Sequence, residues 1–230
     1  MINWQDIDTV LLDMDGTLLD LHFDNYFWLH HLPEKYASAQ NLSLNNSKEE
    51  LKQRYLKQSG KLNWYCLDFW SKELSLNILE LKRDLSHLIS YRPNTVTFLK
   101  QLQASGKKRI LVTNAHPDSL QLKLKHTDLH QHLDVIYSSH SFNKPKEDKQ
   151  FWPDFLKKEY FDVSRTLLID DSVAVLDNAR AFGFQHLLTI QQPDSQQAPK
   201  PIENYDAVSC FSRILPDLSG ATSSTKAPQT

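Results

Sequence analysis

The chain has 230 residues, of which 40% are hydrophobic and 23% are charged, and its formal net charge is −2. A chain of this length and composition builds one sizeable α/β domain, or a core with a smaller insertion. Its charge offers no basic surface to a nucleic-acid polymer and no polybasic anchor to a membrane, and no apolar run approaches the roughly 20 residues of a membrane span.

The start of the chain and its two cysteines indicate a cytoplasmic protein. The acidic start "MINWQDID" leads directly into a strand and does not have the pattern of a signal peptide. Cys66 and Cys210 lie in different regions and form neither a metal motif nor a disulfide framework. We therefore expect both to be reduced packing residues.

The first predicted element is a strand that ends on two acids. In "TVLLDMDGTLLD" (9–20), the apolar run reaches Asp13, Asp15 follows two residues later, and Gly16 and Thr17 turn the chain. Residues i and i+2 of an extended segment lie on the same side, so the two carboxylates would repel each other unless a positive charge lay between them. We therefore expect a cation at this strand end.

The next stretch, residues 21–92, carries only helical patterns. Ser47, with Glu50 three residues later, predicts the start of a helix with a capping box, and Gly60 predicts its end. Further helices are predicted from a shared apolar face and from an amphipathic segment: Leu67, Trp70 and Leu74, and residues 77–89.

This helical stretch interrupts the predicted core. We expect residues 21–92 to form a small helical-bundle cap, inserted between the core segments 1–20 and 93–218; the alternative is that these helices extend the core. Residues 219–230 have no apolar content to bury, so they are predicted to be disordered.

Helices and strands alternate through the rest of the chain. Short apolar runs between helices are typical of a parallel sheet that is covered on both faces. We therefore predict an α/β fold with a doubly wound, mostly parallel, Rossmann-like sheet. Its predicted strands are 9–14, 108–114, 134–139 and 165–171, with weaker ones at 186–190 and 205–208, and its predicted helices are 94–105, 117–126, 148–160 and 173–183.

Acidic residues follow the strands at 9–14 and 165–171. The carboxyl ends of parallel strands are where functional groups gather, so Asp13, Asp170 and Asp171 are expected to meet in one crevice. Carboxylates are hard oxygen ligands, which suit Mg²⁺, and Mn²⁺ accepts the same ligands as a substitute.

Phosphate-binding groups are predicted at two other positions. The strand at 108–114 ends on Thr113 and Asn114, whose hydroxyl and backbone N–H suit phosphate oxygens. The stretch "NKPKED" supplies Lys144, a compact charge that can neutralise both a phosphate and a nucleophile.

Taken in order, "DMDGT", "LVTN", "KPKED" and "LLIDDS" resemble the motifs of the haloacid dehalogenase superfamily of aspartyl-phosphate-forming hydrolases. The resemblance extends from Thr9 to about Val208, and the helical stretch resembles the cap of one subclass. Three longer stretches, "LDLHFDNYFW", "LNWYCLDFW" and "TNAHPDSLQLKLKHT", resemble the bacterial purine nucleotidases that act on GMP and IMP.

The resemblance implies a role for each motif residue. Asp13 would attack phosphorus, and Asp15 would protonate the leaving oxygen, which requires a pKa above the usual value of about 3.9. Mg²⁺ would be held by Asp13, by the main-chain carbonyl of Asp15 and directly by Asp171, while Asp170 would bind through water or orient Lys144. The predicted catalytic residues are Asp13, Asp15, Thr113 and Lys144, and the predicted phosphate-binding residues are Gly16, Thr113, Asn114 and Lys144.

The acid at position 15 favours a phosphatase or a phosphomutase within this superfamily. The related dehalogenases lack it, because a departing halide needs no proton, and the related transport ATPases have Thr there. The substrate is expected to be a small phosphomonoester, and aromatic cap side chains would suit a purine ring. The predicted substrate-contacting residues are Asp20, Asp24, Asn25, Phe27, Trp28, Trp64 and His116.

Several alternatives stay open at this point. Aromatic rings in a small helical insertion are more often its core than part of a binding site, so a core role stays open for each of them. A phosphatase for small sugar phosphates or phosphoglycolate, or a binding protein without turnover, would use the same fold. The oligomeric state is not specified by these patterns, and a monomer is compatible with them.

Overall fold

Six strands form one sheet at the centre of the computed structural model, which describes residues 2–216. The strand order is β3-β2-β1-β4-β5-β6, and each neighbouring pair is parallel. All six predicted strands are confirmed: β1 (Thr9–Leu12), β2 (Lys108–Thr113), β3 (Val135–Ser138), β4 (Thr166–Ile169), β5 (His186–Ile190) and β6 (Asp206–Val208). The prediction for residues 219–230 lies outside the described part of the chain.

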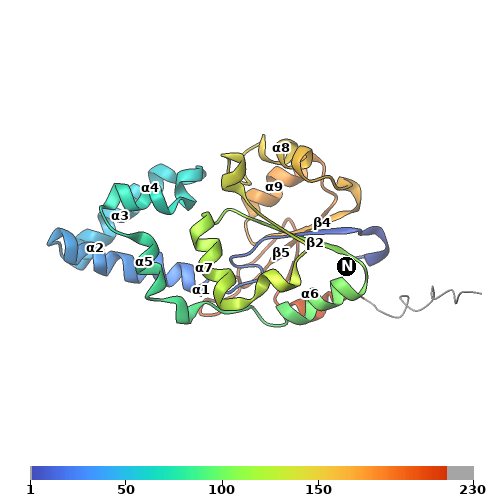
Figure 1. The fold of residues 1–230 in the computed structure, drawn as a ribbon, viewed down its shortest axis with the longest axis horizontal. Coiled ribbons are helices and arrows are strands. Elements are labelled where there is room, and N and C mark those ends of the chain that lie inside the picture. The colour runs from blue at the N-terminus through green and yellow to red at the C-terminus, as the bar shows by residue number, and fades with distance from the viewer. Residues whose placement is uncertain (1, 217–230) are drawn as a thin grey trace, which may run out of the picture.

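Helices cover both faces of the sheet, as predicted. In Figure 1, α8 and α9 lie on one side of the strands and α6 on the other. The four helices predicted for the core are present as α6 (Thr95–Ala104), which precedes β2, and α7 (Pro117–Thr127), α8 (Phe151–Lys158) and α9 (Val173–Phe182). Helix α8 begins later than predicted because Asp148 accepts a hydrogen bond from the N–H of Gln150, which closes a turn before the helix.

The side chains of β1 show why helices pack on both faces of the sheet. Successive side chains of a strand point to opposite faces. Val10 and Leu12 belong to a hydrophobic cluster with Leu99 of α6, whereas Leu11 belongs to a second cluster with Phe155 of α8. Every residue of β1 is buried, and the three residues after Thr9 are all apolar instead of alternating with polar ones.

Residues 22–88 form a separate set of helices to one side of the sheet, here called the helical segment (Figure 1). Its α-helices are α1 (His22–Tyr26), α2 (Leu32–Gln40), α3 (Leu44–Gln58), α4 (Leu67–Leu74) and α5 (Ile78–Arg83), with a π-helical turn at Phe27–His31 between α1 and α2. Short 3₁₀ turns complete the chain: Trp4–Asp6, Leu62–Tyr65, Ser86–Leu88, Leu129–His132, Ser139–Phe142, Val163–Arg165 and Phe211–Arg213. No helix among residues 2–216 is long and apolar enough to cross a membrane.

The helical segment has its own apolar cluster. Leu67, Trp70 and Leu74 share a buried face, as predicted. The same cluster includes Leu122 of α7, while Leu120 of α7 packs in the sheet cluster. Helix α7 therefore packs against both parts of the molecule.

The predicted start of helix α3 is wrong. Ser43, rather than Ser47, is the N-cap, and its side chain accepts a hydrogen bond from the N–H of Asn46. Ser47 lies inside the helix, where its hydroxyl donates to the carbonyl of Pro33. Two serines one turn apart have the same local chemistry, and contact with α2 separates their roles.

Candidate active site

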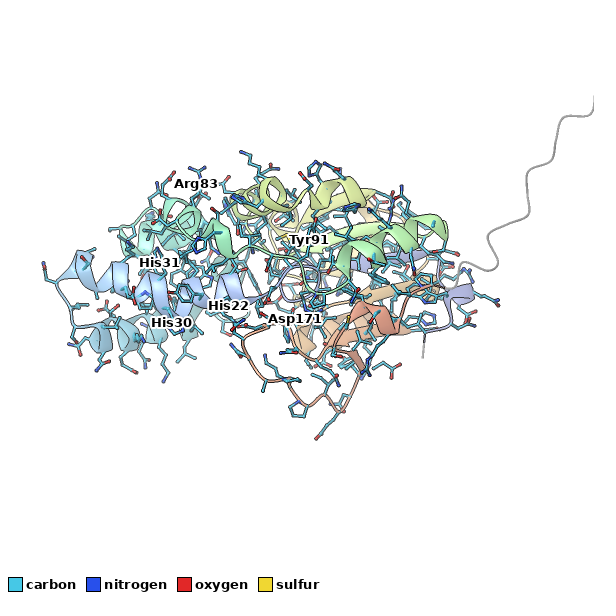
Figure 2. All side chains as sticks on the ribbon, turned by 90° about the horizontal axis from the view of Figure 1, so that it is seen from below. His22, His30, His31, Arg83, Tyr91 and Asp171 are labelled. Atoms are coloured by element: carbon cyan, nitrogen blue, oxygen red, sulfur yellow. The ribbon has the colours of Figure 1, made fainter. Side chains whose placement is uncertain are left out.

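The ends of two neighbouring strands bring three carboxylates together. Asp13 follows β1, and Asp170 and Asp171 follow β4, with Leu12 and Ile169 paired in register just before them. Carboxylate oxygens of the three lie within 4.8 Å of one another. In Figure 2, Asp171 lies between the helical segment, where His30 and His31 are labelled, and the helices around the sheet.

The lysine in this cluster is Lys146, not the predicted Lys144. Its buried Nζ donates to Asp13 Oδ1 and to Asp170 Oδ2, both at 2.6 Å. Lys144 instead forms a partly exposed ion pair with Asp154, at 3.0 Å. The turn from Pro145 to Asp148 directs the second lysine of "KPK" inward. The two lysine side chains are chemically identical, so the tertiary structure decides which of them is buried.

The cluster has more negative charge than Lys146 neutralises. Loss of solvation, with Asp170 nearby, raises the pKa of Asp13 to about 6 against the opposing effect of Lys146. Loss of solvation and the charges of Asp13 and Asp170 raise the pKa of Asp171 well above its ordinary value. The Asp171 carboxylate has no hydrogen bond or ion pair with a residue in the described range 2–216. Hard oxygen ligands with excess negative charge are a suitable site for a divalent cation such as Mg²⁺.

Gly16 permits this arrangement but does not line the cavity. Its φ is +88°, and a Cβ on it would lie 2.5 Å from Asp171 Oδ2. Its N–H donates to the carbonyl of Leu19, so it is not free for phosphate, and the predicted phosphate-binding role is corrected. A side chain at position 16 would displace the Asp171 carboxylate.

Asp15 belongs to a line of alternating charges that leads into the helical segment. Lys123 Nζ donates to Asp15 Oδ1 and to Asp24 Oδ2, and Lys82 Nζ donates to Asp24 Oδ1, each at 2.6 Å. Both lysine side chains are 2% exposed. The Nζ of Lys82 also lies 4.8 Å from the ring centre of Phe23, where a cation–π contact adds to its ion pair.

These contacts set the charge states of the two acids. Burial and the nearby carboxylates raise the pKa of Asp15 to about 6, although Lys123 opposes the rise. This is the direction that an acid acting near neutral pH needs. Burial would also raise the pKa of Asp24, but Lys123 and Lys82 together hold it below its usual range. Both oxygens of Asp24 are occupied by lysines, so it is a partner of these side chains rather than a free reader of substrate.

Lys82 and Lys123 are missed by reasoning from the sequence, although a signal is present. Lys123 is three residues after Leu120 and four before Thr127, on the buried face of α7, whereas Lys125 falls on the exposed face. Helical periodicity therefore marks Lys123 as a buried lysine, which is rare without a carboxylate partner.

The loop after β2 is held in place by side chains from two directions. The Thr113 hydroxyl accepts a hydrogen bond from the N–H of Ala115 at 3.0 Å and keeps its own proton to donate. Asn114 donates to Glu147 Oε2 at 2.9 Å and accepts from the N–H of Lys146 at 2.9 Å. Tyr65 of the helical segment donates to Glu147 Oε1 at 2.9 Å. The helical segment is thus connected directly to this loop.

One cavity of about 300 Å³ joins these groups. Of the predicted site residues, those that line it are Asp13, Asp15, Asp24, Asn25, Trp28, Trp64, Thr113, Asn114, His116, Asp170 and Asp171. Lys146, Lys123, Lys82 and Tyr65 line it as well and were not predicted.

Two predicted substrate contacts lie elsewhere. Phe27 is fully buried in the apolar cluster of the helical segment, so it is a core residue. Asp20 holds a turn, because its Oδ1 accepts from the N–H of His22 at 2.9 Å and of Ser195 at 3.1 Å. Neither residue lines the cavity, and both predictions are corrected.

Comparison with known proteins gives consistent matches. The family model of the haloacid dehalogenase-like hydrolases matches residues 10–188. The GMP/IMP nucleotidases YrfG of Escherichia coli (strain K12) and Shigella flexneri are each 45% identical over 217 residues, which is 94% of this chain and 98% of theirs.

Solved structures share the fold at lower sequence identity. The HAD phosphatase from Thermococcus onnurineus superposes with a TM-score of 0.74 at 20% identity, covering 90% of this chain and 95% of that one. The L-2-haloacid dehalogenase from Xanthobacter autotrophicus has a TM-score of 0.56 at 17% identity, with 83% and 80% covered.

Proposed function

The chain belongs to the haloacid dehalogenase-like hydrolases and is a phosphatase acting on phosphomonoesters, and from this premise we propose that it is a Mg²⁺-dependent nucleotidase for GMP and IMP. The observation that carries the proposal is a single cavity lined both by Asp13, Asp15 and Lys146 and by the rings of Trp28 and Trp64. The 45% identity to GMP/IMP nucleotidases over nearly the whole of both chains supports the same substrate class.

The first step of the proposed reaction is an attack by Asp13. A carboxylate oxygen of Asp13 forms a bond to phosphorus, and the bond from phosphorus to the nucleoside oxygen breaks. Asp15, whose raised pKa of about 6 keeps a protonated fraction available near neutral pH, gives its proton to that leaving oxygen. The phosphoryl group is then held as an acyl phosphate on Asp13, which divides one difficult displacement into two easier ones.

The second step releases phosphate. Asp15, now ionised, takes a proton from a water molecule, whose oxygen attacks phosphorus while the bond to Asp13 breaks. Lys123, 2.6 Å from Asp15, stabilises the ionised form between the two steps. The products are inorganic phosphate and the regenerated Asp13 carboxylate.

In the proposed reaction, groups of the protein stabilise the negative charge on the phosphoryl oxygens. Lys146, Thr113 and Asn114 line the cavity together with Asp13, and we propose that the Lys146 ammonium, the Thr113 hydroxyl and the backbone N–H of Asn114 bind the phosphoryl oxygens. When bound by Asp13, Asp171 and the main-chain carbonyl of Asp15, Mg²⁺ would neutralise negative charge on the phosphoryl group. Asp170 is held by Lys146 and orients it.

A tryptophan of the helical segment favours a substrate that carries a nucleobase. Trp28 is fixed by edge contacts with Tyr55 and Trp70, at ring-centre distances of 5.8 and 5.9 Å. A rigid ring presents a stacking surface at little entropic cost. We propose that residues 22–88 act as a cap that encloses the nucleoside while the reaction proceeds.

The place of action and the assembly state remain predictions from the sequence. We propose that the protein works in the cytoplasm, which is compatible with the free thiols of Cys66 and Cys210. A monomer is sufficient for the proposed reaction, because all the residues named for it come from one chain.

The test is phosphate release from a panel of phosphomonoesters, with Mg²⁺, with Mn²⁺ and with chelator. The panel holds GMP, IMP, AMP, pyrimidine monophosphates, phosphoglycolate and hexose phosphates. We expect the largest kcat/KM for GMP and IMP, dependence on the metal, and at least about 1,000-fold loss in Asp13→Asn.

Each alternative has its own result in that test. A preference for phosphoglycolate or hexose phosphates would remove the purine proposal and keep the chemistry. Appreciable turnover by Asp13→Asn would contradict the covalent route. No release from any compound would favour a binding protein.

A further inference from the structure

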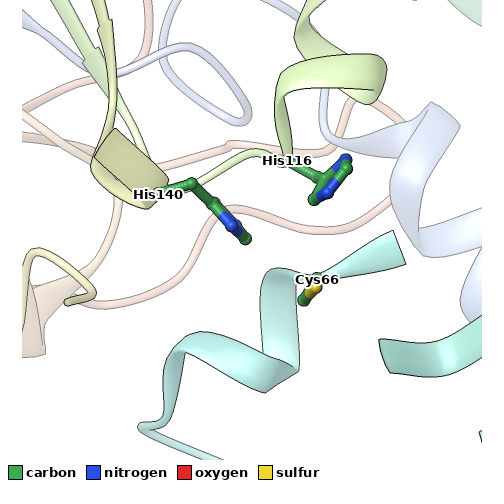
Figure 3. Close-up of side chains that lie close together, drawn as sticks. All are labelled: Cys66, His116 and His140. Atoms are coloured by element: carbon green, nitrogen blue, oxygen red, sulfur yellow. The ribbon is translucent and has the colours of Figure 1, made fainter. Parts of the chain in front are cut away.

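A second group of metal-binding side chains lies beside the cavity. Figure 3 shows Cys66, His116 and His140 converging on one space. One ligand atom from each lies within 4.8 Å of the others. They come from three separate places: the N-cap of α4, the N-cap of α7, and the turn after β3.

His140 is the least explained member of this group. Its Nε2 is buried and has no hydrogen-bond partner among residues 2–216. Burial and the adjacent His116 lower the pKa of His140 to about 4, so the ring is neutral at physiological pH. A neutral imidazole nitrogen that is buried without a partner calls for an explanation, and a bound ion is one such explanation.

The other members offer suitable atoms. Nδ1 of His116 accepts a hydrogen bond from the N–H of Asp118 at 3.3 Å, so the proton of the neutral ring lies on Nε2. To bind a metal ion through Nε2, the ring moves this proton to Nδ1 and gives up that hydrogen bond. That Nε2 lies 3.6 Å from Asp68 Oδ2, on the largely exposed first turn of α4. Cys66 Sγ accepts one hydrogen bond, from the N–H of Phe69 at 3.4 Å, as the N-cap of α4, and a sulfur atom can keep such a bond while it binds a metal ion.

We propose that Cys66, His116 and His140 bind a Zn²⁺ ion between the helical segment and the sheet, with Asp68 or water as the fourth ligand. Thiolate and imidazole are ligands that Zn²⁺ prefers, whereas Mg²⁺ prefers the oxygens of the Asp13 cluster. Bonds of about 2.0–2.3 Å in a tetrahedron place ligand atoms roughly 3.3–3.8 Å apart. Since the ligand atoms already lie within 4.8 Å of one another, each pair needs to approach by no more than about 1.5 Å. Cys66 releases its proton to solvent when its sulfur binds the ion.

The proposed Zn²⁺ site lies between two parts of the molecule, so a bound ion would affect the rate of turnover. Cys66 belongs to the helical segment, while His116 and His140 belong to the loops that follow β2 and β3. An ion held by all three joins the two parts of the molecule. If the helical segment opens to release product, as the proposed function requires, bound Zn²⁺ slows turnover.

Binding is tested first, without reference to activity. Purified protein in excess Mg²⁺, which occupies the carboxylate cluster, is titrated with Co²⁺ and then with Zn²⁺. We expect one Co²⁺ per chain with a thiolate-to-cobalt charge-transfer band, which Zn²⁺ displaces. Cys66→Ser abolishes the band, His140→Gln weakens Zn²⁺ binding by at least about 100-fold, and the control Cys210→Ser changes neither.

Two outcomes would overturn the binding site. One is the absence of a charge-transfer band in the wild type. The other is a band of equal strength in Cys66→Ser, since the thiolate would then come from another residue. Both readouts are spectroscopic, so they stand even if the substrate is not a purine nucleotide.

The effect on turnover is tested with the best substrate of the panel. We expect Zn²⁺ in excess Mg²⁺ to lower kcat at least about tenfold in the wild type and in Cys210→Ser, but not in Cys66→Ser. Equal inhibition of Cys66→Ser would refute the coupling, because the Zn²⁺ would then act at the carboxylate cluster.

Discussion

The two lysines in "KPK", Lys144 and Lys146, have different surroundings, so we expect their replacement to have different effects on stability and activity. Lys146→Met leaves Asp13 and Asp170 buried without their cation, and breaking such a pair costs about 3–5 kcal/mol of unfolding free energy. Its phosphatase activity is expected to fall at least about 100-fold, because a fixed positive charge at the phosphoryl group is lost.

Lys144→Met is the matched control for that variant. Its ion pair with Asp154 is exposed to solvent, so we expect little change in the free energy of unfolding and unchanged turnover. Urea denaturation and phosphate release measure both effects. The reverse order of the two variants would contradict the assignment of Lys146.

Asp171 is expected to reduce stability when no metal is bound. Its pKa is raised in the folded protein, so its contribution to stability is complete below the unfolded pKa and is lost as pH rises through the folded pKa. In chelator at neutral pH, Asp171→Asn should therefore have a higher Tm than the wild type, and the difference should grow as pH rises.

The same Asp171→Asn variant should lose most of the increase in Tm that Mg²⁺ gives the wild type, because it lacks a proposed ligand. Thermal melts across a range of pH, with and without Mg²⁺, measure both effects. A chelator-treated variant that melts below the wild type at neutral pH would show that Asp171 has a stabilising partner instead.

At the scale of elements, Lys123 of α7 connects the loop after β1 to α1, because its Nζ pairs with Asp15 and Asp24. Lys123→Met leaves Asp15 and Asp24 buried without this cation, and we expect about 3–5 kcal/mol of destabilisation. Lys125→Met, on the exposed face of the same helix, should stay within about 0.5 kcal/mol.

A double-mutant cycle identifies the ion pair as the cause. Adding Asp24→Asn to Lys123→Met should recover part of the loss, with a coupling energy of about 0.5–3 kcal/mol. Urea denaturation of the four proteins gives the value. Strict additivity would mean that the ion pair between Lys123 and Asp24 does not contribute to stability.

At the scale of the whole molecule, Tyr65 connects the helical segment to the loop after β2. Tyr65→Phe removes the hydrogen bond to Glu147 but keeps the ring. The contact between the helical segment and the loop after β2 is therefore weakened, while the fold is retained. We expect KM for the best substrate to rise about fivefold to tenfold, with Tm little changed.

Tyr160→Phe provides the control for that change, since Tyr160 is 83% exposed. Its KM and Tm should match the wild type. A Tyr65→Phe protein with unchanged KM would indicate that this contact does not contribute to enclosing the substrate.

Much of the fold follows from local patterns in the chain. The six strands and the helices between them were predictable because a buried parallel strand is continuously apolar and a covering helix has one apolar face. The meeting of Asp13, Asp170 and Asp171 was also predictable, since parallel strands end at one edge of the sheet.

Other features depend on packing between distant segments. The inward turn of Lys146, the burial of Phe27 and the use of Asp20 to hold a turn are decided by contacts with residues far away in the chain. Neighbouring residues of one type have the same local preferences, so local patterns cannot separate Lys144 from Lys146. The meeting of Cys66, His116 and His140 has the same origin, because it requires the helical segment to lie against the sheet.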